Sequence, residues 1–215
     1  MDILENKKFV ICDVDGTIFD RMLFYTVAFS RVCEPYGIKP EVSRAHYIQT
    51  AGDVIAEQFG SLLEKSGMNS PDEVKKCCEL FWASAKHAPA PLFKGARETL
   101  IKLREKNKIL FATSGSNEDE LKELFAANSL PPFVMILGSD KIPKGEKHIR
   151  AFAASMNLPL EEFVLNAVLV GDGPSDMRIA KQCGILGIGV TTTTTAEILI
   201  NAGASETISL LSEVI

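Results

Sequence analysis

The sequence predicts an α/β fold, in which a doubly wound (Rossmann-like) parallel sheet carries an inserted all-helical cap domain. The first observation behind this prediction is that short apolar segments alternate with amphipathic helical patterns, which is typical of a parallel sheet covered on both faces. The second is that the interval 19–91 holds several amphipathic helical patterns and no convincing strand. The third is that polar side chains directly follow several of the apolar segments.

Five apolar runs predict the strands of the sheet. Each is short, is rich in Ile, Leu, Val or Phe, and is bounded by polar, glycine or proline residues, as expected for buried strands. The predicted strands are residues 8–12, 108–112, 133–137, 167–170 and 185–190.

Helical patterns separate most of these strands. Residues 95–107 gather their leucines on one face, with charges on the opposite face. Residues 116–129 begin with Ser116 as a plausible helix cap and carry an acidic residue three positions on. Residues 174–184 have proline at the start and glycine at the end. The threonine run 191–195 predicts a loop that leads into another helix cap.

The long helical interval divides the chain into two predicted domains. The α/β core comprises residues 1–18 and 92–215, and the helical cap domain comprises residues 19–91. Residues 19–20 and the APAP segment 88–91 are the predicted connections between the two. The clearest helical patterns of the cap domain span residues 23–37, 51–67 and 70–87.

Composition narrows the class of protein. The chain has 215 residues, 46% of them hydrophobic, so a large core is expected. A net charge of −5 and an isoelectric point near 5.3 argue against binding nucleic acid or an anionic membrane surface. The five cysteines are odd in number and lack zinc-site spacing, which favours reduced thiols. With no apolar signal core or membrane-spanning stretch, we expect a cytoplasmic protein, a monomer or a weak homodimer.

Polar side chains follow four of the predicted strands at their carboxyl ends. In an open parallel sheet these ends lie along one edge, where ligands bind. Each cluster alone is a weak signal, but together they predict one crevice. The residues are Asp13 and Asp15 after the first strand, Thr113, Ser114 and Ser116 after the second, Lys144 after the third, and Asp172 and Asp176 after the fourth.

The clustered aspartates predict a divalent cation. Carboxylates that approach one another in a buried site repel unless positive charge lies between them. Mg²⁺ is the natural candidate, because it accepts one or two carboxylates together with waters and a phosphate oxygen. An EF-hand is excluded by the position of the glycine in residues 13–17 and by the missing glutamate, and no P-loop motif is present.

This set of motifs resembles the haloacid dehalogenase superfamily, and the resemblance covers nearly the whole chain. The family's DxDGT motif is DVDGT at residues 13–17, and its GDxxxD motif is GDGPSD at residues 171–176. Thr113 matches the second motif, an apolar strand ending in Thr or Ser, and Lys144 matches the third. The helical insert and the C-terminal segment are similar to the phosphoglycolate-phosphatase-like and beta-phosphoglucomutase-like branch.

The resemblance implies a set of roles for the acidic residues. Asp13 would be the nucleophile that forms an aspartyl-phosphate, and Asp15 would be the general acid and base. Mg²⁺ would be held by Asp13, the main-chain carbonyl of Asp15, Asp172 and, in direct contact or through an intermediary, Asp176. The plainer alternatives are that Asp13 and Asp15 cap a turn and that Asp172 and Asp176 belong to a helix cap.

The resemblance also implies a phosphate-binding set. Thr113 and Lys144 would bind phosphoryl oxygens, and main-chain N–H groups near Gly16 and Ser114 would add donors. Alternatively, Thr113 is an ordinary strand residue and Lys144 a solvated lysine, with Lys141 and Lys147 as competitors for its role. The histidines are isolated in the sequence and are not candidate catalytic residues; they are His46, His87 and His148.

The function that follows is a Mg²⁺-dependent phosphatase acting on a small phosphorylated metabolite. Dehalogenases of the family lack the second aspartate, so Asp15 favours phosphate-ester chemistry. The alternatives are a sugar phosphomutase with the same nucleophile and a catalytically silent protein that binds a phosphorylated ligand. Gly52 resembles a glycine of the cap loop that faces the active site, so Thr50 and its neighbours are candidate specificity residues, although an ordinary turn explains them equally well.

Overall fold

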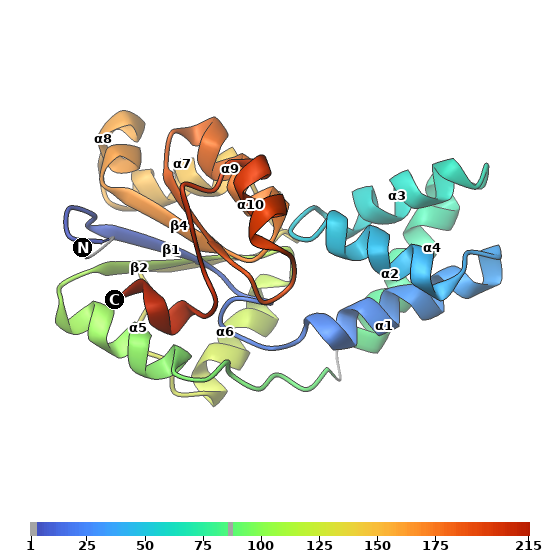
Figure 1. Cartoon of the computed structure of the whole chain (residues 1–215), viewed down its shortest axis with the longest axis horizontal. Coiled ribbons are helices and arrows are strands. Elements are labelled where there is room, and N and C mark those ends of the chain that lie inside the picture. The colour runs from blue at the N-terminus through green and yellow to red at the C-terminus, as the bar shows by residue number, and fades with distance from the viewer. Residues whose placement is uncertain (1–3, 86–87) are drawn as a thin grey trace.

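The computed structural model describes residues 4–85 and 88–215, and it confirms the predicted α/β fold. A parallel sheet with helices on both faces forms one part of the molecule, and a bundle of helices forms the other (Figure 1). None of the helices in these described ranges is long and apolar enough to cross a membrane. All five cysteines are free thiols.

The sheet has six parallel strands in the order β3-β2-β1-β4-β5-β6. Five correspond to the predicted strands, and β6, a three-residue edge strand, was not predicted. Strands β2 and β3 extend the sheet on one side of β1, and β4, β5 and β6 then extend it on the other side. The direction of strand addition therefore reverses at β1. The strands are β1 (Phe9–Asp13), β2 (Ile109–Thr113), β3 (Met135–Leu137), β4 (Ala167–Gly171), β5 (Leu186–Val190) and β6 (Glu206–Ile208).

Alternating side chains of the central strands build two separate cores. Val10 and Cys12 of β1 point to one face, while Phe9 and Ile11 point to the other. Both faces are fully covered, which explains why the strands are continuous apolar runs. The stacked rings of Phe9 and Phe163, with centroids 4.6 Å apart, tie β1 to the helices on the second face.

Each core is closed by its own helices, which lie on opposite sides of the sheet in Figure 1. The first is covered by α5 (Ala96–Glu105), α6 (Glu118–Ala127) and the 3₁₀ helix η2 (Leu211–Val214). The second is covered by α7 (Glu146–Ser155), α8 (Leu160–Leu165) and α9 (Pro174–Cys183). Helices α5, α6 and α9 were predicted, whereas α7 and α8 were not.

Two helix starts test the predicted caps. Thr195 ends the threonine run and caps α10 (Ala196–Ala202), since its hydroxyl accepts a hydrogen bond from the Ile198 N–H. The predicted cap Ser116 is wrong: Asn117 caps α6 instead, accepting from two main-chain N–H groups of the first turn. The Ser116 hydroxyl donates to an aspartate of the candidate site, which leaves the capping role to its neighbour.

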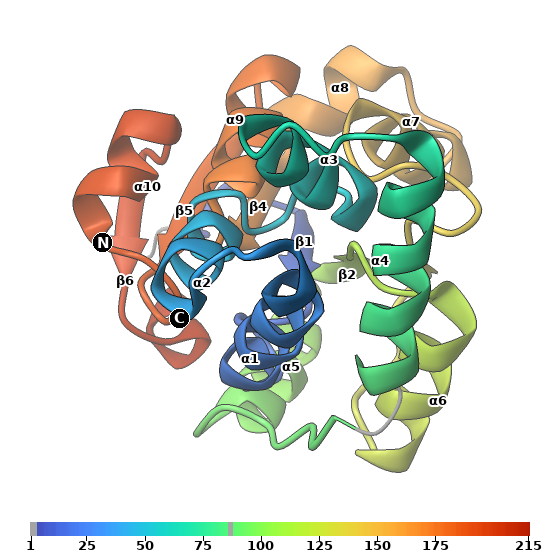
Figure 2. The same cartoon turned by 90° about the vertical axis from the view of Figure 1, so that its right-hand side faces the viewer.

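Residues 22–85 form a helical bundle with its own apolar core. Phe29 lies at its centre, stacked on Phe59 with ring centroids 4.2 Å apart and in edge contact with Phe81. Figure 2 looks at the bundle from the side opposite the sheet. Its elements are α1 (Met22–Cys33), η1 (Glu34–Tyr36), α2 (Pro40–Gln49), α3 (Ile55–Lys65) and α4 (Pro71–Ala85). The end of the predicted helical segment 70–87 lies outside the described residues.

The two chain segments that join the bundle to the sheet run side by side. Phe19 and Leu92 form an antiparallel bridge, and the N–H of Asp20 donates to the carbonyl of Pro91 at 2.8 Å. The N–H of Phe93 donates to the carbonyl of Ile18 at 3.0 Å. The bundle is therefore joined to the sheet by a short two-stranded connection.

The bundle core generates a stability prediction. Phe29 is fully buried, so Phe29→Ala leaves a large cavity and is expected to lower the free energy of unfolding by about 3–5 kcal/mol. The matched control is Leu23→Ala on the same helix, where the side chain is 76% exposed and the expected change is within about 0.5 kcal/mol. Urea unfolding followed by circular dichroism measures both, and equal effects of the two substitutions would contradict the packing described.

Candidate active site

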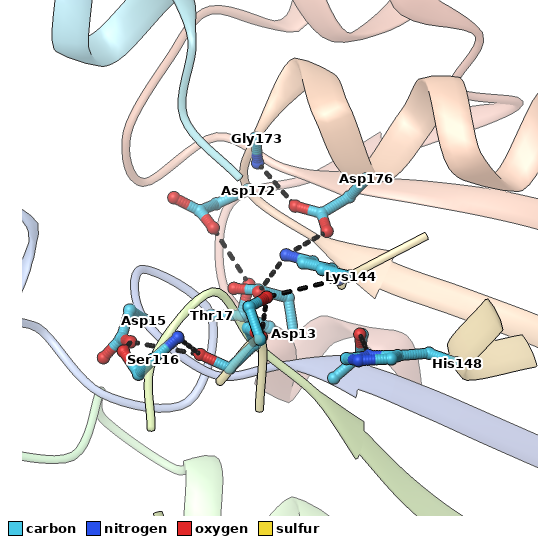
Figure 3. A network of polar contacts seen from close by, with 12 residues as sticks. Asp13, Asp15, Thr17, Ser116, Lys144, His148, Asp172, Gly173 and Asp176 are labelled. Atoms are coloured by element: carbon cyan, nitrogen blue, oxygen red, sulfur yellow. Dashed lines mark hydrogen bonds and ion pairs between the residues drawn. The ribbon is translucent and has the colours of Figure 1, made fainter. Parts of the chain in front are cut away.

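The candidate site lies at the carboxyl ends of β1, β2 and β4, where the strand order reverses. This is the position at which open parallel sheets bind ligands. Asp13 ends β1, Ser114 follows β2, and Asp172 follows β4. Polar residues at the ends of three neighbouring strands therefore lie close together. Figure 3 shows Asp13 and Asp172 converging with Lys144 and Asp176.

Three buried carboxylates form the centre of the site. Asp13, Asp172 and Asp176 each offer an oxygen that lies within 4.8 Å of the others. Lys144 lies between two of them, with its Nζ 2.7 Å from an oxygen of Asp13 and 2.7 Å from an oxygen of Asp176 (Figure 3). One lysine opposite three carboxylates leaves the cluster with an excess of negative charge.

This excess charge perturbs the acidity of the cluster. Burial raises the pKa of Asp13 well above its ordinary value; Lys144 opposes that shift, and the neighbouring aspartates add to it. Burial, followed by repulsion from Asp176, raises the pKa of Asp172 to about 7. Burial alone would lower the pKa of Lys144, but the carboxylates of Asp13 and Asp176 reverse this and raise it, so the lysine stays charged.

The donor set fits a hard divalent cation. Three carboxylates in a buried site supply the oxygen ligands that Mg²⁺ prefers, and a double positive charge would offset the charge that Lys144 leaves uncompensated. Asp13, Asp172 and Asp176 are the side chains placed to hold it. Of the four residues predicted to hold the metal, Asp15 was expected to contribute its main-chain carbonyl. Its carboxylate lies outside the cluster and contacts Arg21 instead.

Gly16 allows Asp172 to approach the first strand. A Cβ atom at position 16 would lie 2.0 Å from Oδ2 of Asp172, and the residue has a φ of +93°. Thr17 and Thr193 then donate to the two oxygens of Asp172, which holds the carboxylate in place. The expected role of Gly16 as a phosphate donor needs correction, because its N–H already donates to the carbonyl of Phe19.

Asp15 has a separate set of partners on the side facing the helical bundle. The Nε and Nη2 atoms of Arg21 each lie 2.5 Å from Oδ1 of Asp15. The hydroxyl of Ser116 donates to Oδ2 at 2.8 Å, and that of Ser114 does so at 3.4 Å. Arg21 and Ser116 thus fix the carboxylate at the cavity wall, and neither contact was predicted.

Thr113 does not reach the cavity, which corrects its predicted phosphate-binding role. Thr113 and Phe111 share one face of β2, and that face is covered by α7. The Thr113 hydroxyl is hydrogen bonded to Nδ1 of His148 at 2.7 Å, and Nε2 of the same ring contacts the carbonyl of Ile142 at 2.7 Å. The next residue, Ser114, lies at the cavity instead.

Of the three lysines considered, Lys144 is the one at the carboxylate cluster. Its side chain is 2% exposed, whereas Lys141 pairs with Glu118 and Asp119 at the surface and Lys147 is exposed. Of the histidines, His46 contacts the carbonyl of Gln58 inside the bundle, His148 is held as described, and His87 lies outside the described residues.

The loop between α2 and α3 packs against the candidate site. A Cβ atom on Gly52 would lie 2.9 Å from Cβ of Ser175 and 3.6 Å from Nζ of Lys144. Asp53 forms an ion pair with Arg178 of α9 at 2.9 Å, which ties the loop to the sheet domain. The candidate specificity residue Thr50 faces the bundle, because its hydroxyl donates to the carbonyl of His46 and to Gln58.

The loop and the bundle close a cavity of about 50 Å³ over the strand ends. Its floor contains the carboxylates of Asp13, Asp15 and Asp172, the side chain of Lys144, and the turn 114–116. Its roof comes from α1, α2, α3 and α4 and from the Gly52 loop. A small group with oxygen atoms, held near Lys144 and the serines, is the ligand that this arrangement suits.

Comparison with known proteins agrees with the geometry. The model of the haloacid dehalogenase-like hydrolase family matches residues 10–190. A phosphoglycolate phosphatase of Neisseria meningitidis serogroup A is 27% identical over 206 residues, covering 87% of this chain and 82% of that protein. A validoxylamine A 7′-phosphate phosphatase of Streptomyces hygroscopicus subsp. limoneus is 25% identical over 200 residues, covering 91% of each.

The fold also matches solved structures. A haloacid dehalogenase-like family hydrolase from Streptococcus pneumoniae superimposes with a TM-score of 0.77 at 20% sequence identity, covering 97% of each chain. At this level of identity the similarity supports the fold alone.

The close approach of Gly16 generates a prediction about the acidic cluster. Gly16→Ala places a methyl group on the Asp172 carboxylate and adds backbone strain, so a loss of more than about 2 kcal/mol of stability is expected. Gly37→Ala is the matched control, because its φ is +71° but no atom lies within 4 Å of the added Cβ. Thermal unfolding compares the two; a Gly16→Ala variant no less stable than Gly37→Ala would contradict the contact.

The raised pKa of Asp172 generates a pH prediction. Without metal, the folded chain retains a proton on Asp172 that the unfolded chain releases near 3.8, so this group makes the fold less stable as pH rises from about 4 to about 7. Mg²⁺ binds the ionised carboxylate and is expected to add about 2.7 kcal/mol at 100 times its Kd near pH 8, and much less near pH 5.5.

Calorimetric melting with MgCl₂ or EDTA measures this difference at both pH values. Asp172→Asn is the control, since it removes the titrating group and a ligand together. Equal stabilisation by Mg²⁺ at the two pH values in the wild-type chain would contradict the assignment.

Proposed function

The chain belongs to the haloacid dehalogenase-like hydrolase family, and we propose that it is a Mg²⁺-dependent phosphatase that hydrolyses a small phosphate monoester through an aspartyl-phosphate. The observation that carries the proposal is the meeting of three buried carboxylates with Lys144 beneath a small closed cavity. The phosphatase names of the relatives support the same reaction class.

Asp13 is the proposed nucleophile. Its carboxylate lies at the end of β1 on the cavity floor, and an oxygen attacks phosphorus while the bond from phosphorus to the alcohol oxygen breaks. When bound to Asp13, Asp172 and Asp176, Mg²⁺ supplies positive charge that shields the anionic nucleophile from the anionic phosphate. Lys144 contributes a further positive charge 2.7 Å from Asp13, where the phosphoryl oxygens would lie.

Asp15 is the proposed general acid and base. It gives a proton to the departing alcohol oxygen in the first step, and in the second it takes a proton from the water that attacks phosphorus and releases Asp13. Arg21 and Ser116 act as positioning residues, because they hold the two oxygens of Asp15 at the cavity wall. Ser114 takes over the phosphoryl-binding role first predicted for Thr113, since it follows β2 and lines the cavity.

The cavity supports hydrolysis by controlling water. The Gly52 loop and the helical bundle cover the strand ends, which lowers the local dielectric and strengthens the attraction between Lys144 and the phosphoryl group. The connection at Phe19 and Leu92 is the proposed hinge for opening. We keep the proposed division into a core, residues 1–18 and 92–215, and a cap, residues 19–91.

A panel of phosphorylated metabolites, measured with MgCl₂ and with EDTA, tests the function. The expected result is release of inorganic phosphate that stops on chelation and returns with Mg²⁺. Conversion of one sugar phosphate isomer into another without phosphate release would indicate a phosphomutase instead. Ligand binding without turnover across the panel would indicate a silent binding protein.

The nucleophile assignment generates a prediction. Asp13→Asn is expected to lower kcat by at least about 10⁴-fold while the fold remains intact, because the amide cannot attack phosphorus. Asp119→Asn, an exposed aspartate on α6, is the matched control and should retain wild-type activity.

A second measurement locates the intermediate. Acid quench during turnover, followed by trypsin, releases peptide 9–21, which is expected to carry one phosphoryl group by mass spectrometry. An active Asp13→Asn enzyme, or a phosphorylated peptide from another part of the chain, would remove Asp13 from this role.

A further inference from the structure

The roof of the cavity has a chemical character distinct from its floor. The side chains that the bundle contributes are mostly apolar or aromatic, and apart from the carboxylate of Asp53, which is paired with Arg178, their polar atoms are neutral. Burial raises the pKa of both Tyr25 and Tyr47, so their hydroxyls stay protonated. Gln58 adds an amide, which is already engaged with Thr50 and the carbonyl of Asp53. The remaining roof side chains are Met22, Ile55, Phe81 and Trp82.

Positive charge is confined to the floor. Among the described residues that line the cavity, Lys144 is the one cation, and it is placed between Asp13 and Asp176 at the phosphoryl end. Two further arginines lie close by, but each is held by a carboxylate. Arg21 pairs with Asp15 at 2.5 Å, and Arg178 pairs with Asp53 at 2.9 Å.

Two ion-paired carboxylates, and no unpaired cation among the described residues, line the space that the alcohol part of a substrate would occupy. Asp15 and Asp53 both line the cavity. A carboxylate on the substrate would therefore lose its hydration against aromatic rings, without a described cation to receive it and with two carboxylates nearby. Burying an unpaired charge in this way is strongly unfavourable. An uncharged hydroxyl group costs far less to bury beside the neutral side chains of the roof.

We propose that this cavity selects phosphate monoesters of compact, uncharged alcohols and discriminates against monoesters whose alcohol part carries a carboxylate. The inference rests on the proposed phosphatase function and adds its substrate class. The small volume of the cavity, about 50 Å³, favours a compact alcohol part. Selectivity arises from the roof, whereas the chemistry is carried out by the floor.

The test compares two esters that differ in one group. 2-Hydroxyethyl phosphate and 2-phosphoglycolate have the same length, but the first ends in a hydroxymethyl group and the second in a carboxylate. The expected result is a kcat/KM at least about tenfold higher for the hydroxyethyl ester. Equal values, or a preference for phosphoglycolate, would overturn the inference.

A general phosphatase substrate distinguishes a failure of the substrate-class inference from a failure of the proposed phosphatase function. If p-nitrophenyl phosphate is hydrolysed but neither small ester is, the substrate class alone is wrong. If none of the three releases phosphate in the presence of Mg²⁺, the proposed phosphatase function fails, and the substrate class fails with it.

A charge placed on the roof provides a second test. Trp82→Arg introduces a cation at the alcohol end of the cavity, and Trp82→Gln removes the same ring without adding charge. We expect Trp82→Arg to lower the preference for the hydroxyethyl ester about tenfold relative to Trp82→Gln. An identical preference in the two variants, with both folded by circular dichroism, would contradict an electrostatic origin.

One lysine close in sequence to the roof requires its own control. Lys86 follows α4 directly in the chain and lies outside the described residues. Lys86→Met is expected to leave the ratio of the two kcat/KM values unchanged. If it lowers the value for phosphoglycolate about tenfold more than that for the hydroxyethyl ester, Lys86 supplies a cation to the alcohol part and the inference is overturned.

Discussion

The structure depends on the crowding of three buried carboxylates around one lysine. Asp13 lies at the end of β1, whereas Asp172 and Asp176 both follow β4, and the pairing of β1 with β4 brings the three carboxylates within 4.8 Å of one another. Burial and, after it, their mutual repulsion make the ionised, metal-free site unfavourable, as the raised pKa values of Asp13 and Asp172 indicate. In the metal-free chain a proton held by Asp172 relieves part of this charge, and a bound cation would replace that proton, so cation affinity and fold stability are expected to be linked.

Glycines at two contacts allow the parts of the site to approach closely. Gly16 leaves room for Asp172, and Gly173 leaves room for the carbonyl of Ala51, which would lie 2.4 Å from an added Cβ. The first contact brings β1 and β4 together, and the second brings the helical bundle onto the sheet domain. The floor and the roof of the cavity are thus positioned by main chain rather than by long side chains, which suits a cavity of small volume.

Much of the architecture could be predicted from local patterns, and most of the errors involve contacts that local patterns do not contain. Five strands and the helical insert follow from hydrophobic periodicity, while the short α8 and the edge strand β6 give weak signals. The side chain of Thr113 was predicted to bind the phosphoryl group from a motif alone, although its shared face with Phe111 places it under α7. The contact of Ser116 with Asp15 spans 101 positions, so it could not be found from spacing.

The pairing of Arg21 with Asp15 couples the position of the helical bundle to the position of a carboxylate in the candidate site. Arg21 is the residue immediately before α1, so it belongs to the segment that leads into the helical bundle, whereas Asp15 belongs to the sheet domain. Any swing of the bundle that carries Arg21 away would leave the Asp15 carboxylate with only its serine partners. The residue proposed as general acid and base is thus anchored in part by the segment that leads into the proposed cap, so the position of its carboxylate depends on the position of the bundle.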